Sequence, residues 1–340
     1  MIGYYVHHHG VGHMTRSASI AGALEEPVTV LSSRCPPADH PAVDWLDLPL
    51  DVPADPLGSR LVDMVTDPTA HDTVHWAPTG VDGLTDRMAA IAAWIARVRP
   101  SVVVVDVSVE IAVFVRLMGV PVVVMAMPGD RTDGPHDLAH RMADRIVAPW
   151  SRDVYDPAHL HPFAGKTHHV GSISRFADRT RDPDAAATEP TVLVLGGAGG
   201  SAVDTRAVEA AARACPDHRW RFAGPGSWVE DVWPLLTGAS VVVTHAGQNA
   251  VADVACAATP AIVIPQERPF DEQMATADAL SRGGIAVTTP SWPAPQAWPR
   301  LLEQASTVDA TRWKRLQTDG AAERAATVIS ELASASGRAR

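Results

Sequence analysis

Cysteine is scarce in this chain of 340 residues, and its three copies lie far apart. Cys35, Cys215 and Cys256 are odd in number, and their spacing suits neither a disulfide framework nor a zinc site. We therefore exclude both. We interpret the three cysteines as small buried side chains of a protein in a reducing compartment.

Positive charge and long apolar runs are also lacking. The chain has 28 Lys and Arg against 39 Asp and Glu, a formal net charge of −11. This balance argues against a nucleic-acid partner, because a phosphate backbone attracts a basic surface. No apolar run could span a membrane, and the N-terminus lacks the features of a signal peptide. We expect no transmembrane segment and a cytoplasmic protein, with peripheral attachment at the inner membrane face left open.

Apolar segments rich in Val and Ile alternate with segments of helical composition. The predicted strands of the first half lie in segments 1–6, 27–32, 101–108 and 120–127, and the alternation continues more weakly through 141–150 and 167–171. Those of the second half lie in segments 191–197, 219–224, 240–247, 260–266 and 284–289. Such alternation is typical of parallel, doubly wound sheets. The polar segment 172–190, which contains proline, separates the two series.

We therefore predict an α/β chain of two doubly wound, Rossmann-like domains that face a cleft. The N-terminal domain is expected over residues 1–172, followed by a linker at 173–190. The second domain is expected over 191–318. A final helix is expected at 319–340, and its packing back on the first domain is left open.

Four histidines gather in "HHHGVGH", residues 7 to 13, at the first turn from strand to helix. Side chains alternate in an extended segment, so His7, His8 and His9 cannot easily converge on a metal. His13 is different because it opens the helix at the carboxyl edge of the sheet, where such folds place their sites. A histidine there is well placed for proton transfer. Arg16 follows one turn later on the same face. It could be a residue of the site or a member of an ion pair on the surface.

A glycine-rich turn follows the first strand of the second half. Gly196, Gly197, Gly199 and Gly200 precede an expected helix, where free backbone N–H groups favour phosphate. The turn is neither a P-loop nor a good dinucleotide fingerprint.

Polar side chains also follow the next two strands of the second half. They are His245, Gly247, Gln248, Asn249 and Asp253 after one strand, and Glu272 and Gln273 after the next. A carboxylate can accept from the two vicinal hydroxyls of a ribose, and an acid–amide pair can bind sugar hydroxyls.

These segments resemble nucleotide-sugar glycosyltransferases of the GT-B fold. The likeness is greatest to the family 28 group, which includes the enzymes that form lipid II in bacteria, with kinship to plant and macrolide glycosyltransferases. The motifs that carry it are "SWVEDVWPLLTGASVVVTHAGQNAVADV", "PQERPFDEQMATADAL" and the N-terminal "GVGHMTR". At motif level it covers residues 191–285 well and 1–20 moderately.

The resemblance implies a role for each matching position. It makes the first domain the acceptor-binding domain and the second the donor-binding domain. It implies His13 as the catalytic base, with Asp106 as the residue that orients it. It implies that the donor contacts are Gly12, Gly197, Ala198, Gly199, Gly200, the Val229 backbone at the uracil, His245, Gly247, Gln248, Asn249, Asp253 at the ribose, and Glu272 and Gln273 at the sugar.

Three features depart from the family pattern, and one residue competes for a role. Asp253 stands where the family usually has Glu, and Ala246 replaces a usual glycine. The Asn that often follows the sugar-binding pair is absent, and Ala275 and Thr276 stand there. Glu110 is a rival to Asp106, since it lies on the following helix. Asp106 could also merely cap the next turn.

The expected activity is inverting, metal-independent transfer of a sugar from a UDP-sugar or dTDP-sugar to a hydroxyl acceptor. The acceptor, whether a small molecule, a lipid-linked compound or a cell-wall precursor, is not encoded in a readable motif. No metal site and no cofactor are expected, because the nucleotide sugar is a co-substrate. Three alternatives stay open: a UDP-sugar hydrolase, since "GVGHMTR" also fits a turn found in hydrolases; a nucleotide-sugar 2-epimerase; and a non-catalytic nucleotide-sugar-binding protein.

Overall fold

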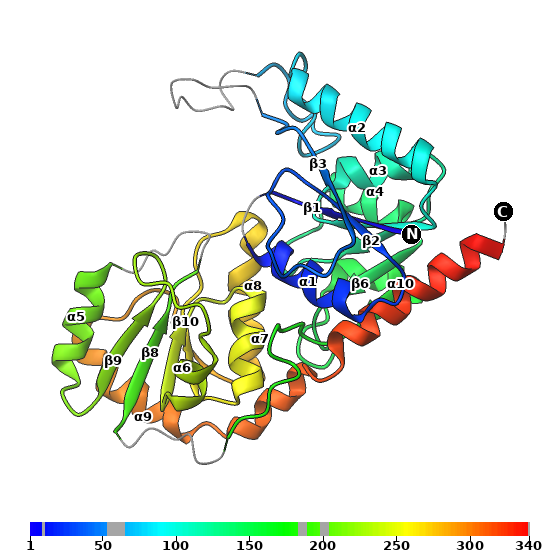
Figure 1. Ribbon diagram of the computed structural model, residues 1–340. Helices are drawn as coiled ribbons and strands as arrows, with labels where there is room; N and C mark the ends of the chain where they lie inside the picture. Colours follow the sequence, from blue (N-terminus) through cyan, green and yellow to red (C-terminus); the bar gives the residue numbers. More distant parts are fainter. Residues whose placement is uncertain (9–10, 53–64, 183–188, 198–203, 339–340) are drawn as a thin grey trace.

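The structure, a computed structural model, describes residues 1–8, 11–52, 65–182, 189–197 and 204–338. It has two lobes, each built on one parallel sheet (Figure 1). The expected α/β class with two doubly wound domains is confirmed.

The first sheet has seven strands in the order β3-β2-β1-β4-β5-β6-β7, all parallel. Its strands are β1 (Ile2–Val6), β2 (Val28–Ser32), β3 (Asp44–Asp47), β4 (Val102–Asp106), β5 (Val122–Met125), β6 (Arg145–Ala148) and β7 (Thr167–His169). The α-helices of this half are α1 (Gly12–Ala23), α2 (Asp82–Val98), α3 (Val109–Leu117) and α4 (Gly134–Met142). Strands β1 and β4 are buried along their whole length, as their continuous apolar sequences require.

Strand β3 is the one strand of the first sheet that the sequence analysis did not anticipate. It lies at the edge of the sheet, and its Asp44 and Asp47 side chains are exposed. An edge strand of this kind has little of the apolar pattern that marks a buried strand.

The second sheet has five parallel strands in the order β12-β11-β10-β8-β9. They are β8 (Thr191–Leu195), β9 (Arg219–Ala223), β10 (Val241–Thr244), β11 (Ala261–Val263) and β12 (Val287–Thr288). The α-helices of this half are α5 (Thr205–Ala214), α6 (Trp233–Gly238), α7 (Gln248–Ala257), α8 (Glu272–Arg282) and α9 (Trp298–Thr307). Helices α6, α7 and α8 cover one face, and α5 and α9 cover the other.

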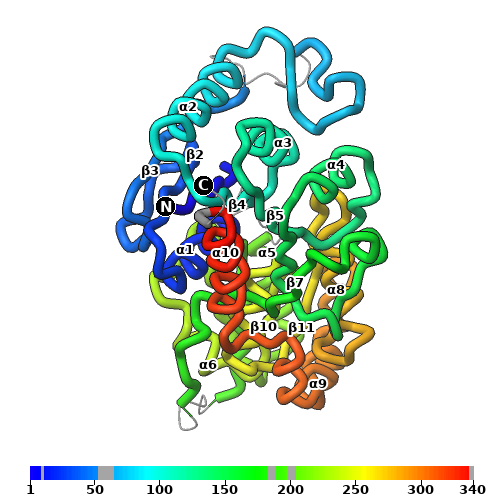
Figure 2. The backbone as a smooth tube through the Cα atoms, turned by 90° about the vertical axis from the view of Figure 1, so that its right-hand side faces the viewer, coloured from blue at the N-terminus to red at the C-terminus, as the bar shows by residue number. Residues whose placement is uncertain are grey.

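The last helix, α10 (Ala321–Arg338), packs on the first sheet although it follows the second in sequence. Figures 1 and 2 show it running from the second lobe along the first, beside α1. Ala325 and Ile329 of α10 are fully buried in the same core as Ile2 and Tyr4 of β1. The N-terminal core is therefore completed by the far end of the chain.

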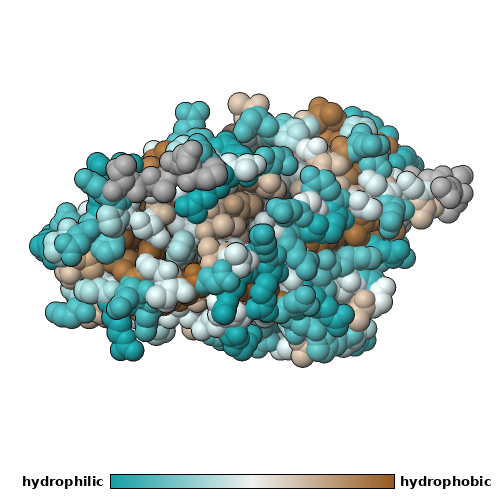
Figure 3. Space-filling model, turned by 90° about the horizontal axis from the view of Figure 1, so that it is seen from below, coloured by the Kyte–Doolittle hydropathy of each residue, from teal (hydrophilic) through white to brown (hydrophobic). Residues whose placement is uncertain are grey.

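The surface seen in Figure 3 is mainly hydrophilic, with small groups of hydrophobic side chains set among the polar ones. No described helix is both long and apolar enough to cross a membrane.

Candidate functional site

A cleft of ≈ 1210 Å³ lies between the two lobes. Its lining comes from the carboxyl ends of strands in both sheets, such as Val107 after β4 and His245 after β10. Parallel sheets place ligands at this edge because strand ends and helix starts meet there. The cleft brings together most of the described residues for which the sequence predicted a role. Three further predicted residues, Ala198, Gly199 and Gly200, lie outside the described residues.

His13 and Asp106 meet at the N-terminal side of this cleft. His13 lies in the first turn of α1, and Asp106 ends β4, the strand that pairs with β1. His13 Nδ1 is 2.9 Å from Asp106 Oδ1, and the carboxylate is fully buried. Burial alone would raise the pKa of Asp106, but the charge of Arg16 and the hydrogen bonds from Arg16 and His13 hold that pKa well below its usual range. Arg16 Nη2 also lies 3.1 Å from His13 Nδ1, but a guanidinium can only donate, and its hydrogens have the Asp106 carboxylate as acceptor. In the neutral imidazole whose Nδ1 donates to that carboxylate, Nε2 has a free lone pair.

Arg16 is the second partner of Asp106 and is itself buried. Its Nε lies 2.9 Å from Oδ2 of Asp106, and its Nη2 lies 2.5 Å from Oδ1. This two-point contact fixes the carboxylate in the plane that also faces His13. Arg16 is therefore a buried site residue, and the surface ion pair considered from the sequence is wrong.

Glu110, the rival to Asp106, is used elsewhere. Its Oε1 accepts from the backbone N–H groups of His75 and Trp76, at 2.8 and 3.0 Å, and its Oε2 accepts from Ser108. These hydrogen bonds organise the loop before α2 and the start of α3, so Glu110 is not placed to orient His13. Of the other histidines in the opening run, His7 and His8 stack on each other with ring centroids 4.6 Å apart, and His9 lies outside the described residues.

The turn after β10 fixes the tautomer of His245. The Gly247 backbone N–H donates to His245 Nδ1 at 3.0 Å, so the ring hydrogen belongs on Nε2. Burial, aided by the charge of Arg268, lowers the pKa of His245 to about 4. The ring is therefore a neutral donor, and its Nε2 points at the turn that follows β8, where a side chain on Gly197 would meet it at 2.6 Å. This arrangement, with the N-terminus of α7 beside it, suits a phosphate.

We expect Gly197→Ala to weaken binding of a nucleoside diphosphate about tenfold or more. The added methyl would push the His245 ring off its donor position, and overpacking of a tight contact typically costs about 1–3 kcal/mol. Calorimetry with UDP on the full-length protein measures the effect. Gly134→Ala is the matched control, since nothing lies within 4 Å of that position. Unchanged UDP affinity in Gly197→Ala would mean that His245 does not face the diphosphate.

The start of α7 also reaches across the cleft. Gln248 Oε1 accepts from Arg16 Nη1 at 2.9 Å, and Asn249 Nδ2 donates to the Gly12 carbonyl at 3.0 Å. Two of the residues expected to meet the diphosphate thus hold the two lobes together in this structure. The starts of α1 and α7 therefore lie side by side and line the cleft together.

Asp253 is the buried residue for which we predicted ribose recognition. It lines the cleft, but its oxygens already accept from Ser174 Oγ at 2.7 Å and Arg175 Nε at 3.2 Å. Burial raises its pKa in spite of these partners. Val229, whose backbone we expected to contact the uracil, is exposed in the cleft lining next to the exposed Trp228.

Glu272 and Gln273, at the start of α8, differ in what they can do. Glu272 lines the cleft, and its carboxylate has a long contact of 3.5 Å with Arg131 Nη2. Gln273 is buried, and its Oε1 accepts from the backbone N–H groups of Ala246 and Gln266, at 3.2 and 3.0 Å. Its amide oxygen therefore ties the turns after β10 and β11 together. Glu272 is the member of the pair that is partly exposed in the cleft.

A loop contact that the sequence did not reveal holds Glu272 in place. The Asp130 backbone N–H donates to the Phe270 carbonyl at 2.7 Å, across the two lobes. Gly129 has a φ of +100°, and a Cβ there would lie 2.1 Å from the same carbonyl. Phe270 and Asp271 both adopt the left-handed conformation, with φ of 62° and 54°, which is strained for side chains of this size. The signal in the sequence was weak, because it consists of a single glycine in "PGDR".

Comparison with known proteins identifies a glycosyltransferase domain in the second half of the chain. Residues 227–297 match the model of the glycosyltransferase family 28 C-terminal domain. The matched residues extend from just before Trp228 to beyond the end of α8, and they include Glu272. A comparison with curated protein sequences gives no match.

Solved glycosyltransferase structures cover nearly the whole chain. The glycosyltransferase of kitacinnamycin is 17% identical and has a TM-score of 0.69, with 97% of this chain and 98% of that chain covered. CalG4, the calicheamicin glycosyltransferase, is 16% identical with a TM-score of 0.64, and 97% and 98% are covered. MurG of Acinetobacter baumannii is 14% identical with a TM-score of 0.63, and 97% and 99% are covered. The resemblance stated from the sequence is thus confirmed: the chain has the GT-B fold and carries a glycosyltransferase family 28 C-terminal domain at residues 227–297.

Proposed function

We propose that the protein is an inverting, metal-independent glycosyltransferase that moves a sugar from a UDP-sugar or dTDP-sugar to a hydroxyl of an acceptor. The observation that carries this proposal is the placement of the His13–Asp106 pair on one side of a single cleft, with His245 and Glu272 on the other. A base on the N-terminal side and phosphate and sugar contacts on the C-terminal side are what the reaction requires.

In the proposed reaction, His13 Nε2 takes the proton from the acceptor hydroxyl. The acceptor oxygen forms the new bond to the anomeric carbon, and the bond from that carbon to the diphosphate breaks with its electron pair on the diphosphate. Asp106 holds the Nδ1 tautomer and stabilises the imidazolium that forms. His13 comes from the first lobe and the diphosphate contacts come from the second. In the proposed reaction the acceptor attacks from the face opposite the leaving group, and this inverts the anomeric centre.

The diphosphate charge would be stabilised by donors that belong to the protein. These are the His245 Nε2–H, the free N–H groups at the start of α7 and the turn after β8. The nucleoside base would lie along Trp228 to Val232, and the ribose near Asp253. No cofactor takes part in this proposal, and the nucleotide sugar is a co-substrate.

Product analysis tests the proposal. The protein is incubated with a panel of UDP-sugars and dTDP-sugars, with and without a mixture of hydroxyl acceptors, and products are identified by mass spectrometry and by anomeric NMR. We expect a glycoside of inverted configuration, formed only with acceptor. Release of free sugar at full rate without acceptor would instead indicate a hydrolase. Conversion of the donor to its 2-epimer would indicate an epimerase, and binding of the donor without any product would indicate a non-catalytic protein.

Glu272→Ala should lower kcat/KM for the donor while UDP affinity stays nearly unchanged. Loss of a hydrogen bond to a charged group costs about 1.5–3 kcal/mol, or about 10- to 100-fold. The measurement compares donor kinetics with UDP calorimetry on the same protein. Glu272→Gln is the matched variant and should retain part of the activity, because it keeps one acceptor oxygen. An equal loss of UDP affinity would mean that Glu272 shapes the phosphate site and does not bind the sugar.

A further inference from the structure

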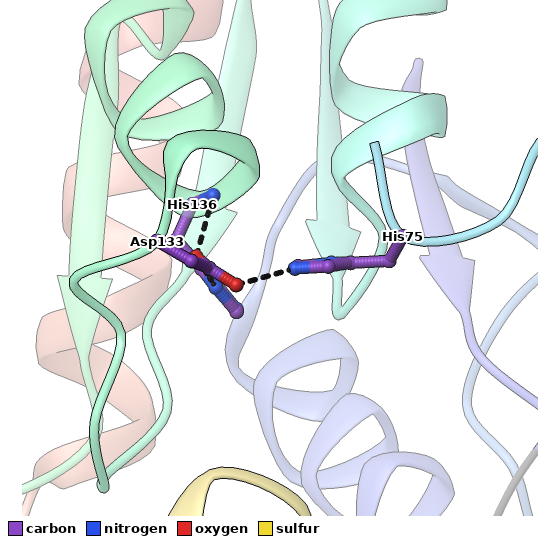
Figure 4. Close-up of side chains that lie close together, drawn as sticks. All are labelled: His75, Asp133 and His136. Atoms are coloured by element: carbon purple, nitrogen blue, oxygen red, sulfur yellow. Dashed lines mark hydrogen bonds and ion pairs between the residues drawn. The ribbon is translucent and has the colours of Figure 1, made fainter. Parts of the chain in front are cut away.

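Two histidines and an aspartate gather beside the cleft, and Arg131 lies between this cluster and Glu272, the residue proposed to bind the sugar. His75 comes from the loop before α2, and Asp133 and His136 come from the start of α4. Figure 4 shows both imidazole rings directing a nitrogen at the same carboxylate. His75 and His136 line the cleft, and all three side chains are partly exposed.

The atoms of this cluster that can bind a metal are close together. His75 Nε2 lies 2.8 Å from Asp133 Oδ2, and His136 Nδ1 lies 2.5 Å from Asp133 Oδ1. The three ligand atoms all lie within 4.8 Å of one another. A tetrahedral ion with bonds of about 2.0–2.1 Å holds its ligands roughly 3.3 Å apart. Small side-chain rotations would therefore be enough to reach that geometry.

The chemistry of the three ligand atoms also indicates which ion would fit. His75 and His136 offer imidazole nitrogens, and Asp133 offers a carboxylate oxygen. Two nitrogens and one carboxylate oxygen suit zinc or a similar transition-metal ion more than magnesium or calcium.

We propose that His75, Asp133 and His136 form a binding site for a divalent ion of the zinc class, with the fourth coordination position open to the cleft. The site is independent of the proposed transfer reaction, because neither His13 nor the phosphate contacts belong to it. Its structural effect is to join the loop before α2 to the start of α4, two elements that face the acceptor side of the cleft.

Arg131 is the group that a bound ion would displace. Its Nη1 lies 3.2 Å from His136 Nε2, and it stacks over the Phe270 ring at 4.2 Å. If Nδ1 of His136 binds the ion, the ring hydrogen moves to Nε2, and the guanidinium N–H can no longer donate there. Arg131 and the ion are also both cations. Arg131 therefore opposes binding, and its removal should strengthen it.

Titration of the full-length, metal-stripped protein with Zn²⁺ by calorimetry, and with Co²⁺ by visible absorption, tests the site. We expect one ion per chain and a Co²⁺ spectrum typical of four-coordinate N/O ligation. His75→Ala and Asp133→Asn should each lower Zn²⁺ affinity at least tenfold. Loss of a residue that only hydrogen-bonds to a metal ligand typically lowers metal affinity by about 10- to 100-fold, and loss of a ligand should cost at least as much. Arg131→Gln should raise the affinity severalfold.

Three variants control for other histidines and for folding. His71→Ala removes an exposed histidine of the same loop region, and His8→Ala and His13→Ala remove histidines of the opening turn. All three should bind Zn²⁺ as the parent does. Asp133→Asn keeps an oxygen that can cap α4, so circular dichroism should show a folded protein. Unchanged Zn²⁺ affinity in His75→Ala, or affinity lost in His13→Ala, would overturn the proposal, as would tighter binding of Mg²⁺ than of Zn²⁺.

Discussion

His13→Ala should reduce sugar transfer by about 10²- to 10⁴-fold, the usual cost of removing a general base. UDP affinity should stay close to that of the parent protein, because the diphosphate contacts come from the other lobe. Steady-state kinetics and UDP calorimetry on the same preparation measure the two quantities. The physical reason is that His13 Nε2 carries the free lone pair created by the Nδ1 contact with Asp106.

The neighbouring histidines provide the controls for this result. His7→Ala and His8→Ala should each cost less activity than His13→Ala, since they stack on each other at the end of β1. Asp106→Asn should lower the rate as well, because an amide can neither fix the tautomer so firmly nor stabilise the imidazolium. A His13→Ala protein with near-normal turnover would sink the proposed mechanism.

Arg16→Ala should destabilise the fold by about 3–5 kcal/mol, the usual cost of leaving a buried charge without its partner. Asp106 is fully buried, and Arg16 supplies two of its contacts. Urea denaturation of parent and variant gives the difference in the free energy of unfolding. In the double variant Arg16→Ala/Asp106→Asn, the cost should be clearly less than the sum of the single costs. Additive costs would mean that the two side chains do not stabilise each other.

The same ion pair gives a direction for the pH dependence of stability. The folded pKa of Asp106 lies well below the value of about 3.9 for an unfolded aspartate, so between the two values the unfolded chain binds more protons. This contribution to stability is therefore complete above about pH 4 and is lost as the pH falls through the folded pKa. Asp106→Asn should flatten the acid side of the stability profile.

The fold was predictable because its signals are local. The valine runs of β4 and β5 and the apolar segments of the second sheet identify buried parallel strands without knowledge of their neighbours. The edge strand β3 escaped notice, since half of its side chains face solvent and carry charge.

A residue of the candidate site was predictable from the sequence only where it lies within a recognisable motif. The position of His13 followed from its turn, and that of Glu272 from the segment around it. The role of Arg16 did not, because its partner Asp106 lies 90 residues away and Gln248 lies 232 residues away. The same is true of His75 and Asp133, which are 58 residues apart and carry no spacing rule. Long-range contacts of this kind depend on the packing of whole elements.

The packing of α10 on the first sheet means that the backbone passes between the lobes twice. The two passages touch: the Ser172 backbone N–H donates to the Leu316 carbonyl at 2.9 Å, and Arg324 donates to the Val170 carbonyl at 2.9 Å. Gly171, with a φ of +85°, allows this approach, since a Cβ there would lie 2.2 Å from the Gln317 carbonyl. Two adjacent backbone connections restrain the lobes more than a single linker would. We therefore expect rotation of one lobe about these connections to disturb fewer contacts than sliding, and a chain cut at one connection to keep its lobes joined by the other.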